Sequence, residues 1–400
     1  MLIELGNKQS LLGTLKGSPF FKRFSDTGII YDNKFAKLDT ILRLLNQIQR
    51  KWLYLKPIFS RGSLKSEENR FNRVDNDFCR IMGVVGKDSK LFHFVDKNIH
   101  HDLEKRCQVM LDQLNRCQRA LFSFLEQKRS IMPRFYFVGD DDLLEIIGQG
   151  SNVSIMQAHF KKLFQATAHV EINKKSSTLI EAFGSQEGES VALVKSVEIT
   201  NDAENWLSQL IAGTKFTLDY LLMSCLEEDD HPQPTNYWDK YPGQVLGLAA
   251  SIRFSSEVTI AFDAANGLSM LKQKLALSLR GNTCCIKKLS SLVALKMKGV
   301  VLDLIHHRDI VDQLLTNQTT SENNWIWQKQ LRYTYKERLC SVQMGLATFN
   351  YSFEYQGNQP KLVYTSLTDR CFLTLTQALH FGFGGMGDHS FFFVKSIYFL

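Results

Sequence analysis

The sequence has little proline and no hydrophobic run long enough to cross a membrane. Only 7 of its 400 residues are proline, so long helices can run without interruption. The longest dense apolar run, at 391–394, is far shorter than the roughly 20 residues of a spanning helix. The N-terminus MLIELGNKQS has neither a basic segment nor a long apolar core. We therefore expect no secretory signal, no membrane contact and a cytoplasmic location.

The common catalytic and metal-binding motifs are also absent. The chain contains no C-x-x-C, no H-E-x-x-H and no G-x-S-x-G. Cys107 and Cys117 lie ten residues apart on one predicted helix, about 15 Å, which is too far for a disulfide. Neighbouring histidines on a helix point about 100° apart, so His100-His101 and His306-His307 do not converge on one ion. We predict buried thiols, surface or capping histidines, no catalytic residue and no metal site.

One acidic cluster, Asp140-Asp141-Asp142, needs separate treatment because three carboxylates could bind a divalent cation. No glycine-bent calcium loop follows it, and an aspartate here is also a good cap for a helix at 143–147. We favour the helix cap.

The charge balance is mildly basic. The chain has 48 Lys and Arg against 41 Asp and Glu, a net charge of +7. The basic residues are spread along the chain, with no run longer than the pairs at 161–162 and 174–175. The clustered basic stripe of nucleic-acid binders is missing, so we expect a solvated surface and no nucleic-acid partner.

Hydrophobic periodicity predicts a mainly helical fold. A helix at 99–129 carries an a/d seam over three heptads, made by Leu103, Cys107, Met110, Leu114, Cys117, Leu121 and Phe124. We favour a helix bundle over a coiled coil because the seam goes no further. An amphipathic helix at 35–55 should end before Pro57. Further helices are predicted at 156–168, 206–225, 244–254, 268–279 and 289–315, with an acidic loop at 227–241.

Alternating patterns predict two short β regions. Residues 170–199, with a turn at 187–189, indicate a small inserted antiparallel sheet. Residues 349–355 and 362–364 predict two more strands around a Gly357-Asn358 turn, before a helix capped by Thr368 or Asp369 that stops at Gly382. The predicted class is mainly α: an elongated multi-helix bundle with an inserted β-hairpin or sheet and a short α/β C-terminal piece.

The glycine-rich C-terminus does not make a phosphate-binding loop. A P-loop needs glycine immediately before Lys and Ser/Thr, because its backbone N–H groups and its lysine surround the phosphates. The Lys-Ser pair of this region, Lys395-Ser396, follows Val394 instead. A complete nucleotide site is therefore not expected.

Long stretches of the chain resemble dynein heavy chains. The linker of that family is similar to KLDTILRLLNQIQRKWLYLKPIFSRG (37–62), ENRFNRVDNDFCRIM (68–82), CQRALFSFLEQKRSIMPRFYFVGDDDLLEIIGQG (117–150) and HFKKLF (159–164). WIWQKQLRY (325–333) and FNYSFEYQGNQPKLVYTSLTDRCFLTLTQAL (349–379) look like the end of the linker and the beginning of the first AAA+ module. YPGQVLGLAASIRFSSEV and LKMKGVVLDLIHHRDIV most resemble the subclass that drives retrograde intraflagellar transport. An axonemal dynein fragment and a stand-alone helical adaptor stay open as alternatives.

The resemblance implies a mechanical role. The family's linker is a lever on an AAA+ ring: ATP binding in the first module bends it, and its straightening drives the motor toward the microtubule minus end. It divides the chain into a linker (1–335), an N-terminal AAA+ fragment (340–385) and a divergent tail (386–400). The implied partners are the AAA+ ring, dynein intermediate, light intermediate and light chains, and microtubules. The implied location is cytoplasm, cytoskeleton and cilium.

The nucleotide site implied by the resemblance is partial. Leu362, Val363, Tyr364 and Thr365 resemble the adenine side of the site. The family then continues into G-x-x-x-x-G-K-[ST], whereas this chain reads MGDHS at 386–390, and Ser366 stands where proline is usual. ATP and magnesium serve the whole motor, so we expect no cofactor and no ATPase activity in this chain alone.

Overall fold

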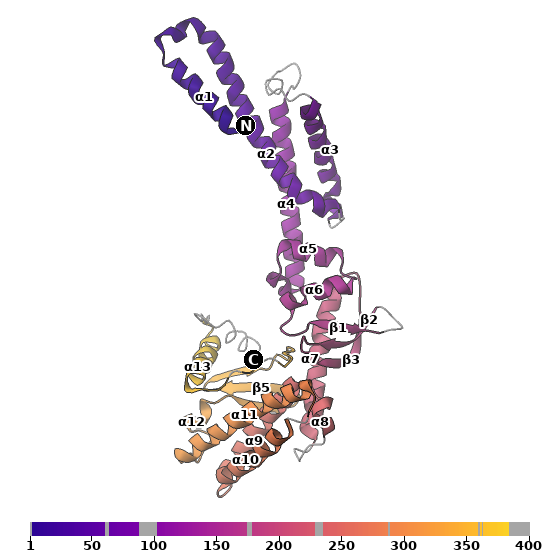
Figure 1. Ribbon diagram of the computed structural model, residues 1–400, viewed down its shortest axis with the longest axis vertical. Coiled ribbons are helices and arrows are strands. Elements are labelled where there is room, and N and C mark those ends of the chain that lie inside the picture. The colour runs from indigo at the N-terminus through magenta and orange to yellow at the C-terminus, as the bar shows by residue number, and fades with distance from the viewer. Residues whose placement is uncertain are drawn as a thin grey trace. The chain divides into compact units, whose positions relative to one another are not determined.

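The computed structural model describes residues 2–60, 64–87, 102–173, 178–228, 235–286, 289–358, 361 and 363–383. The chain divides into two compact units, Met1–Gly148 and Gln149–Leu400 (Figure 1). The described residues are mainly helical, with two three-stranded antiparallel sheets in the second unit. The predicted mainly α class is therefore confirmed. The predicted division near residues 335–340 stays a prediction.

The first unit is built from helices alone in its described residues. Its elements are α1 (Leu2–Lys16), the 3-10 helix η1 (Pro19–Phe24), α2 (Ser25–Ser60), α3 (Lys65–Lys87), α4 (Leu103–Ile131), the 3-10 helix η3 (Pro133–Phe137) and α5 (Asp140–Gly148). Helices α2 and α3 both pack on α4, and α1 packs on α2 (Figure 1).

The seam of α4 is largely the predicted one. Six of its seven predicted residues, Leu103 to Leu121, are at most 4% exposed. The seventh, Phe124, is half-buried, and Leu125 takes its place in the core at 1% exposure. A straight helix has 3.6 residues per turn, so a strict seven-residue repeat drifts off the buried face. The seam prediction is wrong at this last position.

Helix α2 is longer than predicted at both ends. It begins at Ser25 and continues through Pro57 to Ser60. The proline lies in the last turn, where it removes only one backbone hydrogen bond. Beyond it Phe59 is 4% exposed, and its ring stacks on Phe71 of α3 with centroids 4.7 Å apart. This packing keeps the final turn helical, so the predicted stop before Pro57 is wrong.

The second unit combines helices with both sheets. Its elements are α6 (Val153–Leu163), β1 (His169–Ile172), β2 (Leu179–Gly184), β3 (Ser190–Glu198), α7 (Ala203–Glu227), α8 (Thr235–Lys240), α9 (Gly243–Asp263), α10 (Gly267–Cys285), α11 (Ser291–Thr316), α12 (Trp325–Gln328), β4 (Arg332–Lys336), β5 (Leu339–Met344), β6 (Ala347–Asn350) and α13 (Ser366–His380). The predicted inserted sheet is confirmed as β1-β2-β3, which packs on α7. Helix α8 lies within residues 227–241, which were predicted as a loop, so that prediction is wrong at 235–240.

The second sheet, β4-β5-β6, was only partly predicted. The β4–β5 hairpin turns at Glu337 and Arg338, whose φ angles are 50° and 61°. Turns with two positive φ angles usually contain Asn or Gly, so Glu-Arg gives no sequence signal. Strand β6 ends at Asn350, so the strand predicted over 349–355 is wrong beyond that residue. Phe353 has a φ of 52°, which is incompatible with an extended strand. Residues 363 and 364 of the second predicted strand are not in a strand.

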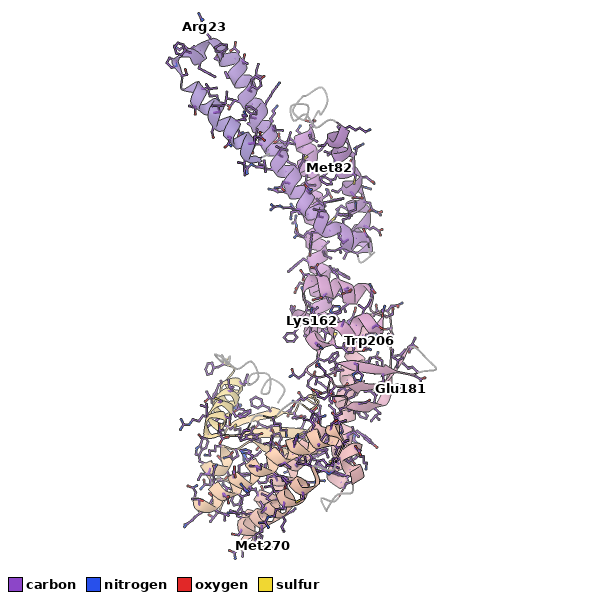
Figure 2. The ribbon with its side chains drawn as sticks, viewed as in Figure 1. Arg23, Met82, Lys162, Glu181, Trp206 and Met270 are labelled. Carbon is purple, nitrogen blue, oxygen red and sulfur yellow. The ribbon has the colours of Figure 1, made fainter. Side chains whose placement is uncertain are left out.

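The core of the second unit lies between α9, α10 and α11. Buried side chains from these helices and from α12 form one cluster, which includes Phe254, Val258, Ile310, Val311, Leu314 and Trp327. Helix α9 is long and apolar enough to cross a membrane, yet 56% of that apolar window is buried inside the unit. Its hydrophobicity is explained by this core. Trp206 of α7 is also fully buried and donates through Nε1 to the carbonyl of Gly150 at 2.9 Å (Figure 2).

Candidate junction of the C-terminal segment with α9 and α11

After β6 the chain leaves the sheet and is held by a side chain of α9. The Gln244 amide nitrogen donates to the hydroxyl of Tyr351 and to the carbonyl of Glu354, both at 2.8 Å. Its amide oxygen accepts from the backbone N–H of Gln356 at 2.9 Å. One glutamine therefore satisfies backbone groups that a neighbouring strand would otherwise satisfy.

A buried carboxylate ties the first sheet to this segment. Glu189 lies in the turn between β2 and β3 and is 2% exposed. Its Oε1 accepts from the backbone N–H of Gly243 at 3.0 Å, and its Oε2 accepts from the Tyr355 hydroxyl at 2.6 Å. Lys296 of α11 places its ammonium 3.1 Å from Oε1. We call this group, formed by Glu189, Gly243, Lys296 and Tyr355, the Glu189 anchor.

The ammonium of Lys296 is itself fully partnered. It donates to the carbonyls of Trp238 at 3.2 Å and Tyr241 at 2.9 Å, at the end of α8. The Lys296 side chain is 5% exposed. A buried ion pair is tolerated when further hydrogen bonds satisfy both partners, and the Glu189 anchor meets that condition.

A second contact with the segment lies further along α11. Asp303, with a side chain 6% exposed, pairs with Lys361, whose side chain is 38% exposed. Burial raises the pKa of Asp303, and the charge of Lys361 opposes that rise. One turn later the His306 ring stacks on Tyr364, with centroids 3.7 Å apart and planes 8° apart. Burial lowers the pKa of His306 to about 4, so the ring is neutral at pH 7. We call the two contacts together the α11 latch.

Lys361 lies near two helix glycines, closely at Gly247 of α9 and at ordinary van der Waals distance at Gly299 of α11. A Cβ at Gly247 of α9 would lie 3.0 Å from the Lys361 ammonium, and one at Gly299 of α11 would lie 3.8 Å from Lys361 Cε. Glycine inside a helix costs roughly 1 kcal/mol relative to alanine. The close approach of the lysine accounts for Gly247. A cavity of about 420 Å³ adjoins this place, with Gln244, Asp303, His306, Lys361 and Tyr364 in its wall.

The structure gives the predicted adenine-side residues three different environments. Val363 is 65% exposed, and Tyr364 lies against His306. Thr365 caps α13: its hydroxyl accepts from the N–H of Thr368 at 3.3 Å, and the Thr368 hydroxyl accepts from the N–H of Thr365 at 2.7 Å. The predicted cap at Thr368 or Asp369 is therefore wrong by three or four residues. Leu362 lies outside the described residues, and the adenine role of the group stays a prediction.

The residues of the junction were mostly missed by sequence analysis. His306 and His307 were assigned surface or capping roles, which is wrong for both. His307 is 6% exposed, its ring stacks on Phe254 with centroids 4.0 Å apart, and burial lowers its pKa. Their position in an apolar helix, LKMKGVVLDLIHHRDIV, was the available signal. Nothing comparable marks Glu189, since its partners are 54 and 166 residues away.

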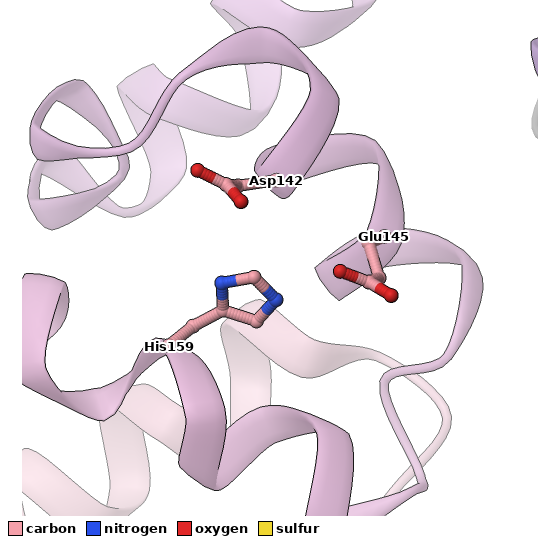
Figure 3. Close-up of side chains that lie close together, drawn as sticks. All are labelled: Asp142, Glu145 and His159. Carbon is pink, nitrogen blue, oxygen red and sulfur yellow. The ribbon is translucent and has the colours of Figure 1, made fainter.

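The acidic cluster at the end of the first unit has a structural explanation. Helix α5 begins at Asp140, so the three aspartates occupy its first turn and do not precede it as a cap. Carboxylates are favoured there by the helix dipole, and Asp140 also pairs with Arg129 at 2.6 Å. Asp142 and Glu145 leave the same face of α5 (Figure 3). His159, also shown there, belongs to the second unit, so the three define no metal site within either unit.

Two family descriptions match parts of the chain on either side of α9 and α11 in the sequence. The dynein heavy chain N-terminal region 2 matches residues 1–225, which include Glu189. The hydrolytic ATP binding site of the dynein motor region matches 351–388, which include Tyr355, Lys361 and Tyr364. The chain belongs to the dynein heavy chain family.

Within that family, the chain is similar to cytoplasmic dynein 2 heavy chains. Cytoplasmic dynein 2 heavy chain 1 of Tripneustes gratilla is 45% identical over 96% of this chain, and that of Caenorhabditis elegans is 44% identical over 96%. The human protein of that name is 43% identical over 96%. In each case the chain spans only 9% of the relative's length.

Proposed function

We propose that this chain is the linker, the mechanical lever, of a minus-end-directed dynein that carries retrograde intraflagellar transport. The observation that carries the proposal is the 45% identity, over 96% of the chain, with a cytoplasmic dynein 2 heavy chain 1. In this proposal residues 1–335 form the lever, and residues 340–385 begin the first AAA+ module.

The packing of the first unit suits a lever. Helix α4 has 29 residues, about 44 Å at 1.5 Å per residue, and its seam is buried against α2 and α3. Close-packed interiors have low compressibility and transmit strain. The Glu189 anchor supports the same role in the second unit, because it connects the inserted sheet and α11 to the start of the ATP-binding region.

The partners and cofactors belong to the larger motor. The lever acts on its AAA+ ring, and ATP and magnesium bind in the ring. The dynein intermediate, light intermediate and light chains and the microtubule are partners of the whole motor, in the cytoplasm and the cilium. Within this chain, Leu362, Val363, Tyr364 and Thr365 are proposed as the adenine side of the first site.

Live imaging in a ciliated cell tests this proposal. A fluorescent tag on the endogenous heavy chain that contains this segment should move processively from ciliary tip to base. A tag fixed along the axoneme would overturn the proposal in favour of an axonemal dynein. A tagged polypeptide that purifies with a separate, intact dynein ring would overturn it in favour of a helical adaptor.

A further inference from the structure

We infer that Asp303 and His306 of α11 position a segment formed by Lys361 and residues 363–365, and that α11 thereby responds to nucleotide bound at that segment. The inference rests on the proposed function and adds the residues through which the lever and the ATP-binding module communicate. Neither residue touches nucleotide in this scheme, so both are positioning residues.

Side chains hold the segment in place. Lys361 and residues 363–365 lie outside every helix and strand of the described structure. Asp303 and His306 are three residues apart, which places them on the same face of α11. They contact Lys361 and Tyr364, which are also three residues apart. The α11 latch therefore fixes the segment at two points.

Gly247 of α9 lies close to the ion pair of the latch. Asp303 Oδ2 and the Lys361 ammonium would lie 3.4 Å and 3.0 Å from a Cβ at Gly247. Any larger residue at position 247 would meet the ion pair directly. The stack of His306 on Tyr364 adds an apolar contact that a neutral ring makes best, and the low pKa of His306 keeps the ring neutral.

The residues of the α11 latch are more exposed to solvent than those of the Glu189 anchor. Both charged partners of the anchor are at most 5% exposed, whereas Lys361 is 38% and Val363 is 65% exposed. The segment thus has one side on α11 and another open to a ligand, within the region that matches the hydrolytic ATP binding site. A ligand that contacts the open side changes the free energy of the latched position. By thermodynamic reciprocity the latch then changes the affinity for that ligand.

The latch itself is tested in the 400-residue chain by hydrogen–deuterium exchange. Asp303→Asn and His306→Ala should each speed amide exchange in α13 and residues 363–365 by about tenfold, with exchange in α10 unchanged. His306→Phe keeps a flat ring and should behave like the wild type. The matched control is Asp309→Asn, which alters an exposed aspartate of the same helix. The positioning role would be overturned by unchanged amide exchange in both latch variants. It would also be overturned if His306→Phe exchanged as fast as His306→Ala.

The response to nucleotide is tested in the full-length heavy chain with the non-hydrolysable analogue AMP-PNP. Bound AMP-PNP should slow amide exchange in α11 of the wild type and of Asp309→Asn, and this protection should fall at least fivefold in Asp303→Asn and His306→Ala. Equal protection in all four proteins, or no protection of α11 in a wild type that binds AMP-PNP, would overturn the inference. A failure of the proposed function would appear separately, as a wild-type heavy chain that binds nucleotide but does not move in cilia.

Discussion

At the scale of single residues, the most consequential side chain is the carboxylate of Glu189. It accepts hydrogen bonds from two segments that are distant in sequence and pairs with Lys296. Sequence patterns could not reveal it, because a glutamate in a turn is ordinarily solvated. Its role depends on tertiary neighbours that no local periodicity encodes.

Removal of either charge of the Glu189 anchor should destabilise the folded chain. Lys296→Met or Glu189→Gln should each lower the free energy of unfolding by about 3–5 kcal/mol, because the remaining charge stays buried without its partner. The double variant should lose less than the sum of the two. Urea unfolding followed by tryptophan fluorescence measures all three.

The exposed pair Lys274–Glu257 provides the matched control. Its side chains are 54% and 27% exposed, so Lys274→Met should cost less than about 1 kcal/mol. Equal losses for Lys274→Met and Lys296→Met would contradict the structural role of the anchor.

Two histidines of α11, the half-buried His306 and the buried His307, predict acid sensitivity. Their folded-state pKa values are depressed, to about 4 for His306, so the unfolded chain binds more protons below about 6.5. Their contribution to stability is complete above pH 6.5 and is lost as the pH falls toward 4. Asp303, with its raised pKa, opposes this trend at the acid end.

Urea unfolding at several pH values measures this sensitivity. Over the range from pH 6.5 to about 4, each histidine should add at most about 1.4 kcal/mol per pH unit to the slope. His306→Phe, which keeps an aromatic ring on Tyr364, should reduce the slope by one histidine's share. The same slope in His306→Phe and the wild type would show that His306 does not titrate as described.

At the scale of elements, sequence periodicity worked where one face of a long helix is buried. The seam of α4 was predicted nearly to its end, since a buried stripe leaves a strong local pattern. The C-terminal end of α2 was not predicted, because the packing of Phe59 keeps the turn after Pro57 helical. The β4–β5 hairpin was not predicted either, because its turn at Glu337-Arg338 lacks the Asn or Gly that usually marks such a turn. The strand predicted over 349–355 shows the same limit. The alternating pattern stops forming a strand after Asn350, and Gln244 of α9 bonds the Tyr351 hydroxyl, the Glu354 carbonyl and the Gln356 N–H instead.

The buried seam of α4 predicts unreactive thiols. Cys107 and Cys117 are fully buried, and burial raises the pKa of each to about 11. Cys79 and Cys284 are exposed. Brief treatment with N-ethylmaleimide at pH 7.5 should modify the exposed pair at least a hundredfold faster, as read by peptide mass spectrometry. Rapid modification of Cys107 in the folded chain would contradict the packing of α4.

At the scale of the whole molecule, the two compact units differ in charge. Residues 1–148 carry 25 Lys and Arg against 18 Asp and Glu, and residues 149–400 carry 23 of each. The entire net charge of +7 therefore lies in the first unit. The Glu189 anchor and the α11 latch both belong to the neutral unit.

The 400-residue chain contains no G-x-x-x-x-G-K-[ST] sequence. In P-loop proteins this motif supplies the backbone cradle and the lysine that surround the phosphates. The purified protein should release no phosphate from ATP above the buffer background in a malachite-green assay, with an intact dynein heavy chain as the positive control. Steady turnover by the purified chain would contradict this expectation.

Surface turns are ordinarily the parts of a protein in which insertions and deletions are best tolerated. The turn between β2 and β3 is an exception, because Glu189 reaches Tyr355, a residue 166 positions further along the chain. One added residue in this loop would withdraw the carboxylate from three partners at once. Its length should therefore be held constant by selection, much as the spacing of a catalytic loop is, although it performs no chemistry.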